Sequence, residues 1–100
     1  MRREALDPLG WLQSWYANQC NGDWEHDYGV EITTLDNPGW RVRINCVGTA
    51  TEGRVFSPIR IDRTETDWLH AWVENGQFNR ACGAHNLTEA LEAFRRWAGG

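Results

Sequence analysis

The stretch Trp40-Arg41-Val42-Arg43-Ile44-Asn45-Cys46 decides the fold class of this chain. Apolar side chains at every second position alternate here with arginines and an asparagine. Successive side chains of a strand point to opposite faces of its sheet, so this period of two predicts a strand with one buried face. The other face is expected to carry Arg41 and Arg43 into water. We therefore expect a sheet that is covered on one side.

Further strands are predicted before and after this run. They are residues 28–35, 54–62, 68–73 and 78–82. Asp36-Asn37-Pro38-Gly39 leads into the central run, and Pro-Gly at its centre is typical of a type II turn. Asn75-Gly76 predicts a tight hairpin between the last two strands. Pro58 cannot donate to a strand ladder, so it indicates a sheet edge or a bulge.

Helices are predicted at both ends of the chain. Asp7 suits a helix N-cap and Pro8 suits the first helical position. Near the C-terminus, Asn86 followed by Glu89 resembles a capping box ahead of an amphipathic helix. The sequence thus predicts an α+β domain, an antiparallel meander of four to five strands with an N-terminal and a C-terminal helix packed on one face. The opposite face is then solvated or is a binding surface.

Length and composition are those of one globular domain. The chain has 100 residues, 41% hydrophobic and 24% charged, so we expect one domain over residues 1–100 with its core at about residues 8–98. No apolar run approaches the roughly 18 residues that span a bilayer, and Asp7 and Pro8 interrupt the stretch where a signal peptide needs apolar residues. Three cysteines without a CxxC pair favour free thiols. We expect a cytoplasmic protein with no membrane partner.

The most distinctive charged stretch is acidic. Residues 23–36 contain no lysine or arginine, and their carboxylates are Asp23, Glu25, Asp27, Glu31 and Asp36. Such a stretch is either a solvated loop and strand face or a docking surface for an electropositive partner. Trp24 within it is either a core anchor or an interface hot spot, because aromatic residues are enriched at interface centres. We take these carboxylates, together with Trp24 and His26, as candidate partner-binding residues.

Catalytic and metal-binding patterns are weaker. His26 stands between two carboxylates, which can make a general base, but neighbours on an extended chain point to opposite faces. Cys82 and His85 are three residues apart, yet zinc needs further ligands, and a turn before the last helix explains the segment. Nucleotide, phosphate and metal motifs are missing from the sequence. We favour a binding protein over an enzyme and expect no catalytic residue, no metal and no cofactor.

Two further features bear on partners. The net charge is −4, and phosphate backbones repel a surface that is acidic on average, so we expect no nucleic-acid binding. Trp68, His70 and Trp72 share one face of the predicted strand 68–73. The helices hide this row if it faces them; if it faces outward, it is a binding patch.

Several stretches together resemble the immunity protein 53 family. They are Trp11-Leu12-Gln13-Ser14-Trp15-Tyr16, Gln19-Cys20-Asn21-Gly22-Asp23-Trp24-Glu25-His26, Tyr28-Gly29-Val30, Thr34-Leu35-Asp36-Asn37-Pro38-Gly39-Trp40, Asn86-Leu87 and Phe94-Arg95-Arg96-Trp97-Ala98. The resemblance covers the chain from about Leu9 to Ala98. It implies a small cytoplasmic protein of a bacterial polymorphic-toxin system that binds a cognate toxin domain and neutralises it. An acidic antidote suits a nuclease, because its carboxylates occupy the place of phosphates.

Two other functions stay open at this point. Some relatives are labelled rhodanese-related sulfurtransferase, so one alternative is a small enzyme that uses a cysteine or a histidine. The other is a small-molecule-binding module whose tryptophan-rich face stacks an aromatic compound.

Overall fold

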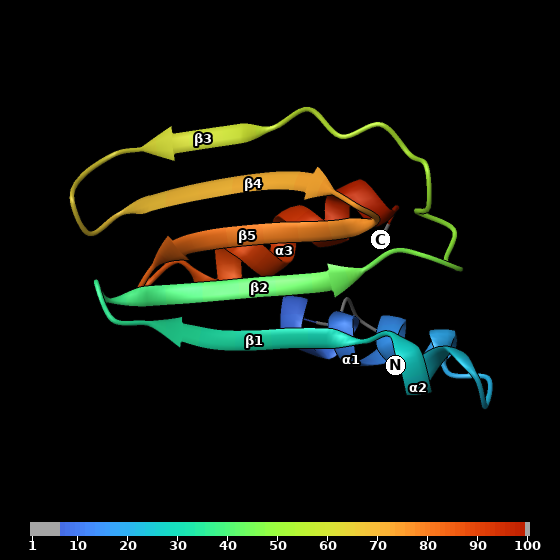
Figure 1. Ribbon diagram of the computed structural model, residues 1–100. Helices are drawn as coiled ribbons and strands as arrows, with labels where there is room; N and C mark the ends of the chain where they lie inside the picture. Colours follow the sequence, from blue (N-terminus) through green and yellow to red (C-terminus); the bar gives the residue numbers. More distant parts are fainter. Residues whose placement is uncertain (1–6, 100) are drawn as a thin grey trace, which may run out of the picture.

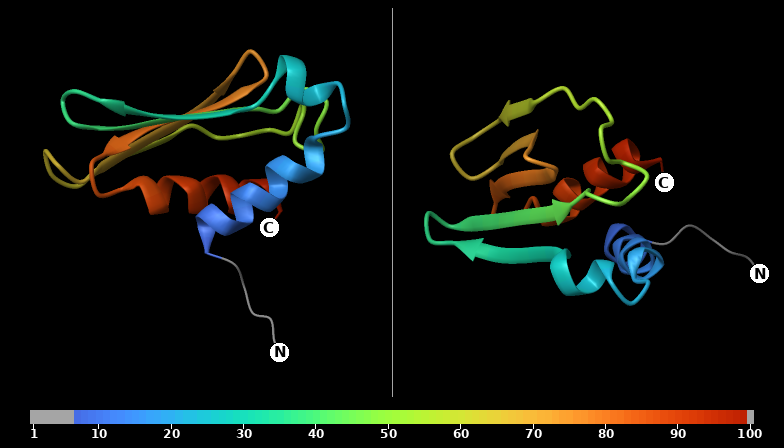
Figure 2. Two further views of the ribbon diagram at one scale, coloured as in Figure 1. Left: turned by 90° about the horizontal axis from the view of Figure 1, so that it is seen from below. Right: turned by 45° about the vertical axis from the view of Figure 1, so that its right-hand side comes forward.

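The sheet and its helices form two layers. The computed structural model describes residues 7–99. Its helices are α1 (Pro8–Gln19), α2 (Trp24–Asp27) and α3 (Leu87–Ala98). Its strands are β1 (Val30–Leu35), β2 (Gly39–Asn45), β3 (Ile59–Asp62), β4 (Trp68–Glu74) and β5 (Gln77–Gly83). The long helices α1 and α3 lie on one face of the sheet, which confirms the predicted α+β class (Figures 1 and 2).

The strand order corrects the predicted meander. All neighbouring strands are antiparallel, but the order across the sheet is β1-β2-β5-β4-β3, so β2 pairs with β5 rather than with β3. The physical reason is burial: β5 is buried along most of its length and takes the centre, whereas every residue of β3 is exposed or half-buried. β3 begins directly after Pro58 and lies at the sheet edge, as the proline indicates.

Two of the three hairpins, β4–β5 and β1–β2, differ in how well their turn sequences predict them. Asn75 and Gly76 both have positive φ, 53° and 75°, as the tight hairpin between β4 and β5 requires. The predicted type II turn before β2 is wrong. That turn type needs a positive φ at Gly39, whereas Gly39 begins β2 and the Asn37–Pro38 peptide bond is cis.

The helix starts follow local sequence signals to different degrees. Asp7 caps α1 as predicted, since its Oδ1 accepts a hydrogen bond from the backbone N–H of Gly10 at 2.6 Å. Asn86 does lie at the N-cap of α3, but its side chain makes no cap hydrogen bond. Its amide instead donates to Asp67 at 2.9 Å and to Glu89 at 3.2 Å, which ties the β3–β4 loop to the start of α3.

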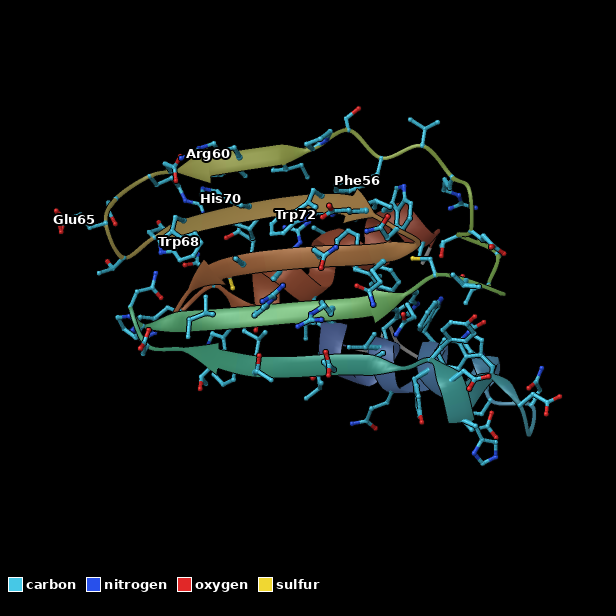
Figure 3. The ribbon with its side chains drawn as sticks, viewed as in Figure 1. Phe56, Arg60, Glu65, Trp68, His70 and Trp72 are labelled. Carbon is cyan, nitrogen blue, oxygen red and sulfur yellow. The ribbon has the colours of Figure 1, made fainter. Side chains whose placement is uncertain are left out.

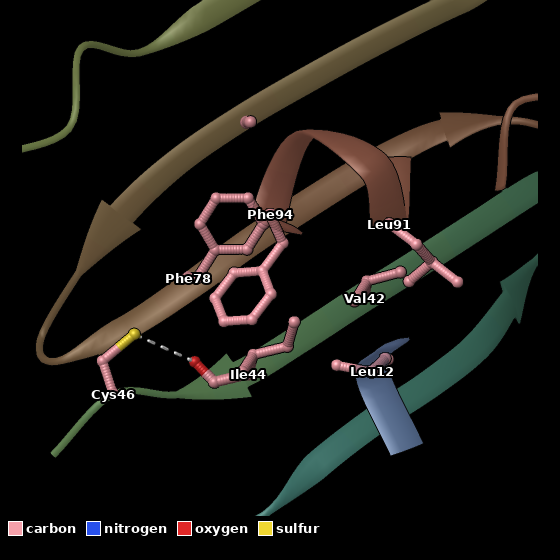
Figure 4. Packing of buried hydrophobic residues seen from close by; sticks show 8 residues of the cluster. Leu12, Val42, Ile44, Cys46, Phe78, Leu91 and Phe94 are labelled. Atoms are coloured by element: carbon pink, nitrogen blue, oxygen red, sulfur yellow. Dashed lines mark hydrogen bonds between the residues drawn. The ribbon is translucent and has the colours of Figure 1, made fainter. Parts of the chain in front are cut away.

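The core lies between the sheet and the two long helices. Val42 and Ile44 of β2, Phe78 of β5 and Phe94 of α3 are each at most 1% exposed, and Leu12 of α1 packs into the same cluster (Figure 4). The alternation read from the sequence of β2 therefore points its apolar residues toward the helices. Burying such side chains supplies most of the free energy that holds the helices on the sheet.

One charged side chain lies inside this core. Arg80 of β5 is 0% exposed, and none of its guanidinium nitrogens has a hydrogen-bond partner among residues 7–99. Its guanidinium carbon is 5.3 Å from the ring centre of Phe78. Burial lowers the pKa of Arg80 to about 10. A buried charge without a partner works against folding.

Candidate functional site

The start of the acidic stretch, which the sequence left open as a solvated loop, is the short helix α2, with Asp23 at its N-cap. Glu25 stabilises the chain just before this helix, because its carboxylate accepts hydrogen bonds from the backbone N–H groups of Asn21 at 2.9 Å and Gly22 at 2.8 Å. Backbone hydrogen bonds, first from its own amide and then from these two, hold the pKa of Glu25 below its ordinary value. The Glu25 carboxylate is thus occupied within its own chain.

Trp24 is a core side chain. It is 6% exposed, and its indole Nε1–H donates to the backbone oxygen of Val47 at 2.7 Å. Its ring lies against those of Trp15, Tyr16 and Tyr28, with centroids 6.0–6.2 Å apart. Of the two possibilities that the sequence left open, the structure shows Trp24 as an anchor that ties α2 to α1 and to the loop after β2. A surface contact with a partner would need it to leave this position.

The structure divides the remaining acidic candidates between two ends of the sheet. Asp23, His26, Asp27 and Glu31 are exposed around α2 and the first residues of β1. Asp36 follows the last residue of β1, beyond a six-residue strand that is roughly 20 Å long. Adjacency in the sequence therefore does not make one acidic patch, and Asp36 is separate from the others.

A cleft joins the first group to the helix-free face of the sheet. It has a volume of about 420 Å³, and His26, Asp27 and Glu31 contribute to its lining. Arg43 of β2 closes one side, with its Nε 3.6 Å from the Glu31 carboxylate. The acidic end of α2 and the open face of the sheet are consequently one continuous surface. We call Asp23, His26, Asp27 and Glu31 the acidic rim.

The tryptophan row of β4 faces outward. Leu69 and Ala71 are each 1% exposed on the helix-covered side, whereas Trp68, His70 and Trp72 alternate with them on the open side (Figure 3). The Trp68 and His70 rings are 5.1 Å apart between centroids. The sequence left open which way this row faces; it faces the helix-free side, with all three side chains half-buried.

Polar contacts hold the row in place. His70 Nε2–H donates to Asp62 Oδ1 at 2.8 Å, and Arg60 Nε–H donates to Asp62 Oδ2 at 3.0 Å. The hydrogen bonds from His70, first, and from Arg60 keep the pKa of the Asp62 carboxyl below its usual value. Two residues further along β4, Trp72 Nε1–H donates to Glu74 Oε1 at 3.3 Å.

The middle of the open face is formed by side chains of β5, the central strand. Ala81 of β5 lies between His70 of β4 and Arg41 of β2, because it pairs with both. One pair further along, Asn79 lies between Trp72 and Arg43. Sequence reasoning predicted that the two arginines face water but did not assign them to a site. The sequence alone could not assign the two arginines to a site, because only the strand order brings β2 and β4 to the two sides of β5.

Of the residues considered for catalysis, His26 belongs to the acidic rim, whereas Cys82 and His85 lie away from it. Cys46 and Cys82 are at most 2% exposed, and burial raises the pKa of both thiols, which disfavours the reactive thiolate. His85 is exposed and lines grooves beside α3, whereas Cys82 points into the core. Among residues 7–99 no group of three or more His, Cys, Asp or Glu side chains is placed to hold a metal ion.

Comparison with known proteins completes this description. None of the helices in the described part of the chain has the length and apolar character needed to cross a bilayer. Searches among curated proteins and among solved structures gave no match. The family model described as immunity protein 53 matches residues 9–99, which is nearly the whole chain. The chain therefore belongs to the immunity protein 53 family.

Proposed function

We propose that this chain binds a cognate toxin domain and blocks it, and that the acidic rim is part of the contact surface. Family membership supports the immunity function itself. The observation that supports this surface is the cleft that joins the exposed carboxylates of Asp27 and Glu31 to the open face of the sheet. A protein partner can reach this surface without displacing either long helix.

The charge of the rim sets the chemistry of the toxin surface. Asp23 and Asp27 are exposed carboxylates, and the one arginine in the lining of the cleft, Arg43, is already paired with Glu31. The toxin surface that meets them is accordingly basic. A nuclease domain presents such a surface because it binds phosphates, and carboxylates of an inhibitor can take their place. The three cysteines are free thiols, which suits binding in the reducing cytoplasm.

Growth rescue tests the function. The toxin domain is the C-terminal domain of the large protein encoded beside this chain, expressed in a susceptible host with and without the chain. We expect toxicity to be suppressed and the two proteins to co-purify. If the toxin domain stops growth equally with and without the chain, and the purified proteins do not bind, the proposed function is wrong.

Reversing the charge of the rim should weaken the complex. Changing Asp23, Asp27 and Glu31 to Lys is expected to raise the dissociation constant by at least about tenfold, mainly through a slower association rate, because charged rims steer encounter. The salt dependence of the association rate should also diminish. Stopped-flow mixing of the toxin domain with wild-type and variant chains at low and high salt measures both.

The matched control is the opposite end of the sheet. Asp36 and Glu65 are exposed carboxylates in the β1–β2 and β3–β4 connections, and changing both to Lys alters charge without touching the rim. This variant should bind within about twofold of wild type. A control variant that loses binding while the rim variant keeps it would place the interface at the far end of the sheet.

A further inference from the structure

The open face of the sheet carries two rows of side chains, one on each side of β5. One row is Trp68, His70 and Trp72 of β4, and the other is Arg41 and Arg43 of β2. Between the rows lie Ala81, which is half-buried, and Asn79, which is 5% exposed because its neighbours cover it. The rows are two strand spacings apart, which is about 10 Å. We call these two rows the aromatic face.

Each arginine or histidine in the two rows beside β5 has a polar partner except one. Arg43 is paired with Glu31, and the His70 ring with Asp62. Arg41 is exposed, and no carboxylate or hydrogen-bond acceptor contacts its guanidinium within residues 7–99. A guanidinium presents five donors in a planar fork that matches a carboxylate. The aromatic face therefore combines a row of aromatic rings with one unused cation.

We propose that the aromatic face binds a segment of the toxin domain that places apolar side chains against Trp68 and Trp72 and a carboxylate against Arg41. This inference rests on the proposed function, because it takes the toxin domain as the partner. Tryptophan and arginine are enriched among residues that dominate binding energy, and such residues lie near the centre of an interface with polar groups around them. The acidic rim then forms one border of the same contact surface.

Continuity of the surface supports a single partner. Arg43 is part of the aromatic face and also lines the cleft of the acidic rim. Asn45 of β2 and Gln77 of β5 also line that cleft. A hydrogen bond of 3.1 Å joins their side chains, and they follow Arg43 and Asn79 on the same face of the sheet. A segment on the aromatic face and a basic loop at the rim can thus belong to one docked domain.

The carboxylates around the aromatic face favour a protein segment over a nucleic acid. Aromatic side chains with arginines on a sheet also suit single-stranded nucleic acids. Here, however, Glu31, Asp62 and Glu74 border the two rows on the same side of the sheet, and the whole chain carries a net charge of −4. These three carboxylates offset Arg41, Arg43 and Arg60, so the face offers phosphates no net positive charge. A toxin segment that carries one carboxylate among apolar side chains needs only one cation on this face, and Arg41 supplies it.

Calorimetric titration of the toxin domain into variants of the full chain tests the proposal. Arg41→Glu is expected to raise the dissociation constant at least about tenfold, and Trp72→Ala about 30-fold, the effect of removing an interface hot spot. Arg41→Lys keeps the positive charge and should stay within about threefold. Because Trp72→Ala removes a half-buried ring, its fold is checked by thermal melting, and Trp72→Phe serves as a second variant with an intermediate loss.

Matched controls lie on the helix side of the molecule. Arg96→Glu makes the same charge change on α3, where the guanidinium side chain is 78% exposed. Leu9→Ala removes an apolar side chain of α1 that is 51% exposed. Both should bind the toxin domain as wild type does.

Each outcome decides between the two proposals. Wild-type affinity for folded Arg41→Glu and Trp72→Phe, with the wild-type chain still binding and neutralising the toxin, overturns the role of the aromatic face and leaves the function intact. Absence of binding by the wild-type chain overturns both. In a parallel titration, a single-stranded DNA oligonucleotide that binds the wild-type chain and is lost with Arg41→Glu makes the aromatic face a nucleic-acid site and also overturns the proposal.

Discussion

Replacing Trp24 with alanine is expected to lower the free energy of unfolding by about 3–5 kcal/mol, the usual range for a buried tryptophan. The ring is 6% exposed and packs against three other aromatic rings, and its loss leaves a space that α1 and α2 cannot fill without moving. The backbone oxygen of Val47 also loses its indole donor. Urea unfolding followed by circular dichroism measures the change.

The comparison variants separate packing from hydrogen bonding. Trp24→Phe keeps a ring but leaves the Val47 oxygen without its donor, so a loss of about 1–3 kcal/mol is expected. Leu9→Ala, on the exposed side of α1, should change stability by no more than about 0.5 kcal/mol. Wild-type stability of Trp24→Ala with loss of toxin binding would contradict the core assignment and restore Trp24 as a contact residue.

Arg80→Met is expected to stabilise the protein. Burial lowers the pKa of the guanidinium to about 10, so folding works against its charged form by an amount on the order of a few kcal/mol. Because folding lowers the pKa of Arg80, the penalty is fully present below about pH 10 and is relieved only above it. Replacement of a buried charge by an apolar side chain of similar size typically gains about 1–4 kcal/mol.

Arg96 provides the matched control for Arg80. Arg96→Met makes the same substitution on an exposed side chain and should shift the free energy of unfolding by no more than about 0.5 kcal/mol. Both variants are compared with wild type by urea unfolding at pH 7. A net loss of stability in Arg80→Met would show that the charged group, through its contact with the Phe78 ring, holds the core together.

Local sequence signals predicted the elements of this fold well. The alternation from Trp40 to Cys46 correctly separated buried from exposed faces, because one covered face imposes a period of two on any such strand. Asn75-Gly76 and the Asp7 cap act over a few residues, and both were confirmed. Such features depend on backbone conformation and near neighbours, so one sequence contains the information.

These local signals could not predict the strand order. Pairing between β2 and β5 joins segments more than thirty residues apart, with Trp40 opposite Cys82, and no turn residue encodes it. The buried surface of the whole sheet selects β5 for the centre. The meander was wrong for this reason, and the aromatic face, built from β2 and β4, could not be predicted without the correct order.

The candidate site shows the same division. The sequence grouped the acidic residues of 23–36 into one stretch, but β1 carries Asp36 away from Asp27. The carboxylate of Glu25 is occupied by hydrogen bonds from backbone amides. The outward direction of Trp68 and Trp72 depends on which face the helices cover, and strand periodicity alone does not specify that face. What the sequence did predict was that the two tryptophans share a face.

The most direct test of the account follows the indole N–H signals of the seven tryptophans by two-dimensional NMR during titration with the toxin domain. Single Trp→Phe variants assign the signals. The account predicts that the signals of Trp68 and Trp72 on the open face shift, while those of Trp24 and Trp97, whose indoles donate to the backbone oxygens of Val47 and Val55, do not. Shifts at Trp97 with no change at Trp68 and Trp72 would place the toxin on the helix side and contradict the account.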